Sequence, residues 1–377
     1  MSTNKPSRCV LERVPPVAFY PQTRALEPVE RCPEDIPYPS CLRAALEYLG
    51  DPVGCEHLTF DTPCRTQCGY AHLVGVCGAA FKLNWAPGWQ DDNVEIMYMS
   101  DDPWAPFERS ARHIGWQMRY LDQRTDDEAT FRAAIVSSIR DLGRPLIAFG
   151  PIGPPEASLV CGYDEGGDVL IGWSYFQRDF EGVPSIDTEP NGMYRLRDWY
   201  AGTQALAVFE GQVARPALRE TYIDSLRFGL EVMRSATTWG DKANGIAAFD
   251  AWMADLLDDA IFGAADAPLQ WRLYDAHNNN VGWLAEARWY GSLFLREAAV
   301  AAPELVGLEE AADCFKHEHD LMWDVWGAVG GNGRDQGKVA MLMQPRVRRQ
   351  IVALLEQSRE WDMRAARLIA GALEGVA

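Results

Sequence analysis

The chain has 377 residues, which is enough for two domains, and its 47% apolar and 24% charged residues are typical of folded globular proteins. Asp and Glu outnumber Lys and Arg by 54 to 35, giving a formal net charge of −19. A surface this acidic repels phosphate backbones and anionic lipids, which argues against nucleic acid and membranes as partners.

The first twenty residues, MSTNKPSRCVLERVPPVAFY, lack the continuous apolar core of a signal peptide. No stretch reaches the roughly 18 uninterrupted apolar residues of a membrane-spanning helix. We therefore expect a cytoplasmic protein. Nine cysteines in such a chain favour reduced thiols over a disulfide framework.

The first half of the chain alternates short apolar runs with Pro and Gly turn signals, which indicates an α+β domain. Helices are expected over 41–49, 103–114 and 126–142, the last with Thr125 as its N-cap. Strands are expected over 146–153, 158–164, 168–176 and 205–211, with GYDEGG (162–167) as the turn between two of them.

After Pro216 the pattern becomes helical, with apolar residues spaced three and four apart. This predicts a bundle of about five helices, in which the Glu/Arg-rich segment 356–367 presents a solvated face. We expect two domains, an α+β domain over 1–212 and an all-α domain over 213–377.

The stretch PYPSCLRAALEYLG (37–50) brings a cysteine to a predicted helix start. With Ser40 as cap, the unpaired N–H groups and the helix dipole would lower the pKa of Cys41. The same N–H groups could receive the oxyanion that forms when a thiolate attacks a carbonyl. Cys41 is therefore predicted to be a nucleophile, with an ordinary core thiol as the alternative.

PSCLRAALEYLG and the later GPIGPPEASLVCGYDEGGDVLIGW together resemble the two halves of a papain-like, bacteriocin-processing-peptidase-like fold. The chain is most similar to the N-terminal domain of the butirosin-biosynthesis acyltransferase family and to a related uncharacterised bacterial family, which LVGVCGAAFKLNW (73–85) also resembles. The likeness covers roughly residues 10–210. It implies a papain-like first domain that transfers an acyl group, delivered as a thioester, to a small molecule in bacterial biosynthesis.

The chain departs from the family pattern at the catalytic histidine. That position falls on Glu156, and Gly172-Trp173-Ser174 stand where an Asp or Asn would orient the histidine. A carboxylate beside the thiol acts as a base only with a raised pKa, and it raises the pKa of the thiol as well. We expect acyl or amide transfer rather than peptide hydrolysis, without a cofactor. The alternative is a catalytically silent fold that binds a small amine or cation through Glu156.

Two further residues are predicted to take part in catalysis, namely Ser174 and His277. His277 would reach the cleft from the helical domain, or else cap a helix start. The side chains predicted to contact the substrate are Tyr38, His72, Trp173, Tyr163 and Gln177. A scaffold whose helical half forms a homo-oligomer is a third alternative.

Cysteines and histidines are dense in CEHLTFDTPCRTQCGYAHLVGVC (55–77). Thiolates and imidazoles at such density are the ligands of structural zinc. The spacings C-x-H, C-x3-C and C-x3-H differ from the usual C-x2-C pairs. We expect no metal here, and zinc on Cys55, His57, Cys64, Cys68 and His72 stays the alternative.

Overall fold

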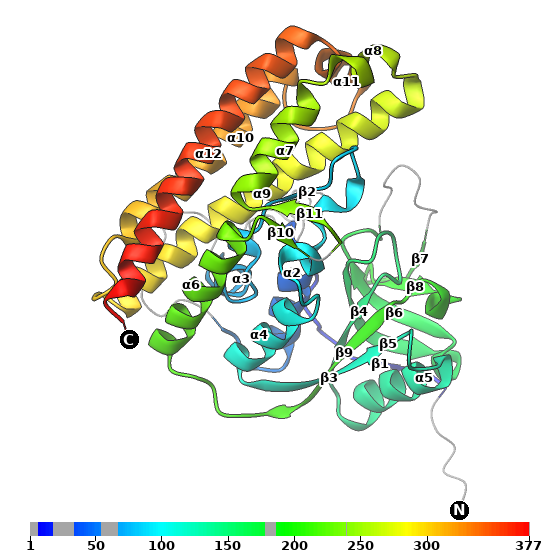
Figure 1. The fold of residues 1–377 in the computed structure, drawn as a ribbon. Helices are drawn as coiled ribbons and strands as arrows, with labels where there is room; N and C mark the ends of the chain where they lie inside the picture. Colours follow the sequence, from blue (N-terminus) through cyan, green and yellow to red (C-terminus); the bar gives the residue numbers. More distant parts are fainter. Residues whose placement is uncertain (1–6, 18–33, 54–66, 178–185, 239, 377) are drawn as a thin grey trace, which may run out of the picture. The chain divides into compact units, whose positions relative to one another are not determined.

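A computed structural model describes residues 7–17, 34–53, 67–177, 186–238 and 240–376 (Figure 1). The chain is a mixed α/β protein with an antiparallel sheet and a helical C-terminal part. It divides into two compact units. The first unit comprises Met1–Gly54, Phe60–Leu73 and Ala111–Arg215; the second comprises Cys55–Thr59, Val74–Ser110 and Pro216–Ala377.

The first unit is built on an antiparallel sheet with the strand order β3-β9-β4-β5-β6-β8-β7, to which β1 adds by pairing with β5. Its described strands are β1 (Cys9–Val10), β3 (Trp116–Asp122), β4 (Leu146–Phe149), β5 (Ala157–Asp164), β6 (Val169–Ser174), β7 (Asp187–Thr188), β8 (Tyr194–Leu196) and β9 (Ala205–Gln212). Central β5 is buried along almost its whole length, which explains its continuous apolar run.

The four strands expected in this part of the chain are all present, with shifted ends. β4 stops at Phe149 because Gly150 turns the chain with a φ of +83°, a conformation that favours glycine. The predicted hairpin turn is confirmed: β5 and β6 are joined by a short 3-10 turn, Glu165–Gly167, with left-handed backbone at Gly166.

Two helices lie wholly within the first unit. They are α2 (Pro37–Tyr48), which packs against β5 and β4, and α5 (Glu128–Val136), which continues as a π turn over Ser137–Asp141. The N-cap of α5 is Asp127, whose side chain accepts from the Thr130 N–H; the prediction of Thr125 as cap is wrong. Two more helices cross the division between the units, α3 (Gln67–Val76) and α4 (Ala105–Ile114).

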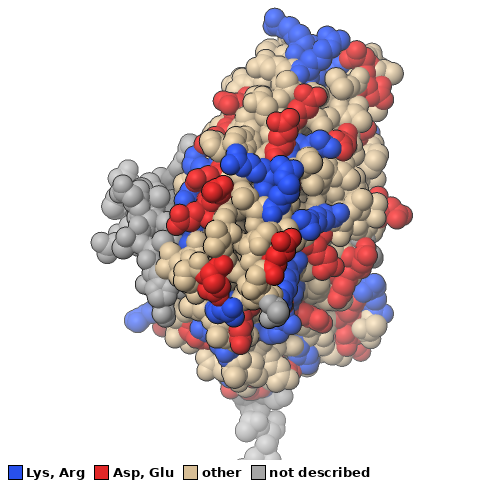
Figure 2. All heavy atoms as spheres, turned by 60° about the vertical axis from the view of Figure 1, so that its left-hand side comes forward, with Lys and Arg blue, Asp and Glu red and all other residues tan. Residues whose placement is uncertain are grey.

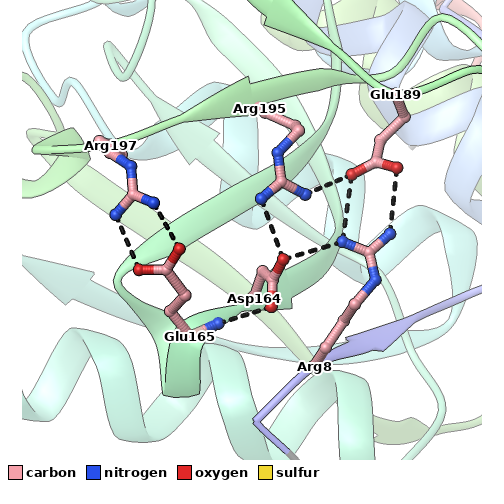
Figure 3. Close-up of polar contacts among 6 residues, drawn as sticks. All are labelled: Arg8, Asp164, Glu165, Glu189, Arg195 and Arg197. Atoms are coloured by element: carbon pink, nitrogen blue, oxygen red, sulfur yellow. Dashed lines mark hydrogen bonds and ion pairs between the residues drawn. The ribbon is translucent and has the colours of Figure 1, made fainter.

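An ion-pair network in the first unit joins Arg8, just before β1, to Asp164 at the end of β5 and to Glu189, just after β7 (Figure 3). Arg8 donates to Asp164 at 3.1 Å and to Glu189 at 3.0 Å and 3.2 Å. Arg195 donates to the same two acids, at 2.9 Å and 2.5 Å. Each arginine therefore bridges both carboxylates, and the four side chains form a closed ring of alternating charge.

The second unit is mainly helical, as expected for the C-terminal part. Its described α-helices after Arg215 are α6 (Leu218–Arg234), α7 (Ile246–Leu256), α8 (Asp259–Ala264), α9 (Ala267–Ala301), α10 (Leu308–Val329), α11 (Gln336–Leu342) and α12 (Pro345–Glu374). The long helices α9, α10 and α12 run side by side (Figure 1). Among the helices in the described ranges, none combines the length and apolar character needed to cross a bilayer.

The same unit contains a small sheet that the sequence pattern did not predict. β10 (Thr237–Thr238) pairs with β11 (Lys242–Asn244), and β11 pairs with β2 (Asn84–Trp85). Three 3-10 turns accompany β2, over Ala79–Phe81, Asp91–Val94 and Ile96–Met99. Trp85 is the last residue of β2, and its ring stacks on that of Trp252 with centroids 5.4 Å apart.

Charged side chains of the second unit are largely paired at its surface. Examples are Arg296 with Asp313 and Lys316 with Asp320. On the face shown in Figure 2, basic and acidic side chains are interspersed. The acidic excess of the sequence is therefore not gathered into a single-sign patch on this face.

Candidate functional site around Cys41

The helix that carries Cys41 begins earlier than the sequence predicted. α2 starts at Pro37, after Ile36 as N-cap in extended backbone (φ −94°, ψ 110°). Ser40 lies inside the first turn: its N–H donates to the Ile36 carbonyl at 3.3 Å, and its hydroxyl donates to Glu34 at 2.8 Å. The prediction that Ser40 caps a helix opened by Cys41 is therefore wrong, because proline is well suited to the first helical turn.

This earlier start changes what the helix end offers to a substrate. Pro37 and Pro39 carry no N–H, and the Ser40 N–H already bonds to Ile36. An oxyanion is stabilised by two or more backbone donors that converge on it. The first turn of α2 therefore does not supply the set of donors that the sequence argument required.

The environment of Cys41 stabilises the neutral thiol. The side chain is fully buried, and burial is the main cause that raises its pKa. Arg43 acts in the opposite direction and lowers the pKa, while the charges of Glu156 and Glu34 raise it further. The net direction is upward, opposite to the lowered pKa that a helix N-terminus was expected to produce.

Arg43 is a buried residue of this site that the sequence analysis missed. Its Nε donates to Glu34 at 2.7 Å, and its Nη1 donates to Glu47 at 2.6 Å. The i, i+4 spacing of Arg43 and Glu47 on a helix was a signal for that second pair. The pair with Glu34 depends on the chain before the helix folding back, which no spacing indicates.

Glu156 lies within range of Cys41 for its charge to act on the thiol. Glu156 precedes β5, is 5% exposed, and lies near enough for its charge to raise the pKa of Cys41. Cys161 sits at a bulge of β5 next to β6, and burial followed by the charge of Cys41 raises its pKa. Burial and the charges of Cys161 and Cys41 likewise raise the pKa of Tyr194 on β8, so its hydroxyl stays neutral.

Buried polar atoms accompany this group on three neighbouring strands. The Ser158 hydroxyl, the Tyr194 hydroxyl and the Trp173 indole N–H make no hydrogen bond to any described residue. Val160, Gly172 and Tyr194 oppose one another across β5, β6 and β8, and Ser158 lies two residues before Val160. Side chains two apart on a strand share a face, so Ser158 and Tyr194 lie on the same face of the sheet.

Gly172 keeps this part of the sheet closely packed. A Cβ at this position would lie 2.0 Å from the Leu159 carbonyl oxygen and 2.9 Å from the Tyr194 hydroxyl. Because β6 runs through such a narrow space, only glycine fits there. Close packing therefore requires glycine at the first position of the Gly172-Trp173-Ser174 segment.

Ser174 and Gln177 stabilise the turn that follows β6. The Ser174 N–H donates to Gln177 Oε1 at 2.9 Å, and Gln177 Nε2 donates to the Gly192 carbonyl at 2.7 Å. The Ser174 hydroxyl accepts from the Phe176 N–H at 3.1 Å. Both side chains are buried and engaged with the backbone.

The remaining residues predicted to contact a substrate are also buried. The Tyr38 ring stacks on Phe149 with centroids 6.0 Å apart, and Tyr163 lies in β5 opposite Leu170. Burial, followed by the charges of His113 and Arg215, lowers the pKa of His72 to about 4. Neither of these two histidines is among the groups whose charge shifts the pKa of Cys41.

His277 belongs to the second unit and lies well inside α9, which begins at Ala267 with Asp266 as its N-cap. The expectation that it caps a helix start is therefore wrong. The ring is 1% exposed, and burial lowers its pKa to about 3. His277 is therefore a neutral imidazole within the core.

Most of the predicted zinc ligands fall outside the described residues. This applies to Cys55, His57 and Cys64, and to the side chain of Cys68. Within the described ranges, no three or more His, Cys, Asp or Glu side chains are grouped so as to hold a metal ion. Zinc at this segment therefore stays the untested alternative.

The site therefore consists of a neutral thiol, the Glu156 and Tyr194 side chains that interact with its charge, and the buried Ser158 hydroxyl on the same sheet face as Tyr194. We call Cys41, Glu156, Ser158 and Tyr194 the Cys41 cluster. The cluster combines the Glu156 carboxyl group with the hydroxyl oxygens of Ser158 and Tyr194, and all three side chains are shielded from solvent. Such a set favours a positively charged hydrogen-bond donor over an anion. Comparison of the chain with protein-family models found no match, and comparison with curated proteins found no significant one.

Proposed function

We propose that the first unit binds a small molecule with a primary amine at the Cys41 cluster and does not use Cys41 as a nucleophile. The observation that carries this proposal is the state of the Cys41 thiol, which burial and two carboxylates keep protonated. A thiol reacts as its thiolate, and a raised pKa leaves little thiolate at neutral pH.

The chemistry of the cluster fits an ammonium group. An ammonium has three N–H donors and no acceptor. The Glu156 carboxylate, the Ser158 hydroxyl and the Tyr194 hydroxyl can each accept one of them. Because Glu156 is 5% exposed, its charge is weakly screened by solvent and attracts a cation more strongly than a surface carboxylate does.

The resemblance to papain-like folds supports this assignment of the site. α2 packs on β5, and Glu156 stands immediately before β5, where the family pattern has its histidine. In a papain-like fold, replacing the catalytic histidine by a carboxylate leaves the substrate-binding site in the same place. It removes the imidazole that takes a proton from the cysteine and returns it during catalysis.

Thiol-dependent acyl transfer is the second candidate, and the proximity of Glu156 to Cys41 favours it. The Cys41 proton would pass to Glu156 while the sulfur attacks a thioester carbonyl. The donor's thiol would leave with that proton, giving an acyl-cysteine. An acceptor amine would then attack the acyl carbon, form an amide and return the proton to the Cys41 sulfur.

One experiment separates the two candidates. Wild type, Cys41→Ala and Glu156→Gln are compared for thermal stabilisation by cyclohexylamine, with cyclohexanol as the matched neutral compound. Amine binding predicts equal stabilisation of wild type and Cys41→Ala, and loss of it in Glu156→Gln. Glu165→Gln, which removes an exposed carboxylate of the same unit, should keep the full response.

The same proteins are incubated with a small acetyl thioester and analysed by mass spectrometry. An acetyl adduct on Cys41, together with amide formation on the amine, would replace the binding proposal by acyl transfer. Absence of both the adduct and the amine-specific stabilisation would overturn both candidates.

A further inference from the structure

The core of the second unit contains polar side chains that make no hydrogen bond to any described residue. Among them are His277, through both ring nitrogens, and the N–H groups of Trp252, Asn280 and Trp89. All four side chains are at most 1% exposed. A buried donor or acceptor left without a partner costs about 1–3 kcal/mol, so such groups in one core require an explanation.

Three of these side chains face the same part of the core. Leu273, His277, Asn280 and Leu284 follow one another on α9 at spacings of four, three and four, which places them along one face of the helix. Leu273 and Leu284 belong to the same hydrophobic cluster as Trp252. The rings of Trp252 and His277 lie 5.4 Å apart, centroid to centroid, at 57°.

Trp89 joins this group through its neighbour Trp85. Trp85 stacks on Trp252 at 5.4 Å and 17°, and Trp89 meets Trp85 edge-on at 5.2 Å. The three indoles therefore form a contiguous aromatic cluster beside His277. A flat ring packs well against aromatic side chains.

Two other indoles of the same core do have hydrogen-bond partners. The Trp85 indole donates to Asp255 at 2.9 Å, and the Trp326 indole donates to Asn278 at 3.0 Å. Asn278 lies on α9 between His277 and Asn280. The helix therefore supplies a hydrogen-bond partner for one indole, while the ring nitrogens of His277 and the amide nitrogen of Asn280 make no hydrogen bond to a described residue.

The unpaired atoms define a donor-rich pattern. Burial keeps His277 neutral, so its ring presents one N–H and one acceptor nitrogen. Trp252 and Trp89 add one donor each, and the Asn280 amide adds two. A fully charged ligand would be desolvated here without a counter-ion among these side chains, which disfavours both carboxylates and ammonium groups.

We propose that His277, Asn280 and Trp252 form a binding site for a small, neutral, planar amide or lactam-type heterocycle. The ligand's carbonyl oxygen accepts from the Trp252 indole and the Asn280 amide, and its N–H donates to the acceptor nitrogen of His277. Its ring packs against the indoles of this aromatic cluster. The site lies in the second unit and is independent of the Cys41 cluster, so failure of either proposal leaves the other intact.

The test uses benzamide as the probe, with benzoate and toluene as matched compounds that lack the neutral amide. Benzamide is expected to raise the unfolding temperature of the full-length protein saturably and to shift the Trp252 indole N–H resonance. Benzoate and toluene should do neither. His277→Leu is expected to weaken benzamide binding at least tenfold and, without ligand, to unfold at the same or a higher temperature, because it removes two unpaired polar atoms.

Asn278→Ala is the control variant, since it alters the neighbouring α9 residue, whose amide already pairs with Trp326. It should lower stability and keep the full benzamide response. Three results would overturn the proposal: no saturable response of wild type, as for a site that holds only water; an equal response in His277→Leu; or an equal response to benzoate or toluene.

Discussion

Glu318 and Asp362 share a single guanidinium in the core of the second unit. Arg288 donates from Nε to Glu318 at 3.1 Å and from Nη2 to Asp362 at 2.8 Å, and all three side chains are fully buried. One positive charge faces two acids. Burial and the neighbouring charge of Asp362 raise the pKa of Glu318 well above its ordinary range, so Glu318 holds a proton and Asp362 balances Arg288.

This shared guanidinium predicts a pH dependence of stability. The folded protein retains a proton on Glu318 that the unfolded chain releases above a pKa of about 4.5. The stability that Glu318 contributes is therefore complete below about pH 4.5 and declines as the pH rises through its raised pKa. Urea unfolding of the second unit from pH 5 to 9 should show this decline.

Glu318→Gln should flatten that pH profile, because the amide keeps the neutral hydrogen-bonding form at every pH. Asp320→Asn, which changes an exposed acid two residues further along α10, should leave the slope as in wild type. Equal slopes for wild type and Glu318→Gln would show that Glu318 is ionised in the folded protein.

The ion-pair ring of Figure 3 predicts a salt-dependent contribution to the first unit's stability. Glu189 is 13% exposed, and hydrogen bonding from Arg8 is the main cause that lowers its pKa. Glu189→Gln should lower the free energy of unfolding by about 1 kcal/mol at low ionic strength and by less in 1 M salt, because salt screens partly exposed charges.

The neighbouring pair of Glu165 and Arg197 provides the control, since both side chains are about half exposed (Figure 3). Glu165→Gln should change stability less than Glu189→Gln does. The Glu189 contribution should also be lost as the pH falls below about 4.5 through the lowered pKa, which unfolding at pH 3 to 6 measures. A salt-independent effect would indicate lost packing instead of lost charge pairing.

Two glycines in long helices should respond to alanine with opposite signs. A Cβ at Gly229 in α6 would lie 2.5 Å from the buried Phe81 ring, whereas one at Gly371 in α12 meets nothing within 4 Å. Gly229→Ala should destabilise the second unit by about 1–3 kcal/mol through overpacking. Gly371→Ala should stabilise it by about 0.5–1 kcal/mol through helix propensity. Chemical denaturation of both variants checks the difference.

The burial of Cys41 predicts slow alkylation in the native protein. Cys41 and Cys161 are fully buried with raised pKa values, whereas Cys9 is partly exposed. Iodoacetamide at pH 8 should modify Cys9 before Cys41 and Cys161, which should react only at the rate of unfolding. Peptide mapping by mass spectrometry measures that order. Rapid labelling of Cys41 in the folded protein would contradict the buried thiol and favour acyl transfer.

Local periodicity was enough to predict several elements of this fold. The strands near residues 146, 158, 168 and 205, the hairpin turn and the helical C-terminal part all follow from apolar spacing and turn residues. These features depend on neighbours within a few residues in the chain, so a single sequence contains them.

The same patterns misjudged features that depend on distant residues. Segment 356–367 looked like a solvated charged face, yet Asp362 within it is fully buried, because its partner Arg288 arrives from α9. Spacing along a helix shows which charges can pair and does not show which one faces the core.

For the candidate site, the sequence indicated a helix that carries a cysteine and a strand preceded by a carboxylate, and the family resemblance led us to expect the two near each other. Only the tertiary structure decided their chemical state. Burial of Cys41 and the folding of Glu34 and Glu156 towards it hold the thiol neutral. A pKa is set by desolvation and by charges nearby in space, and both arise only when segments far apart in the chain pack together.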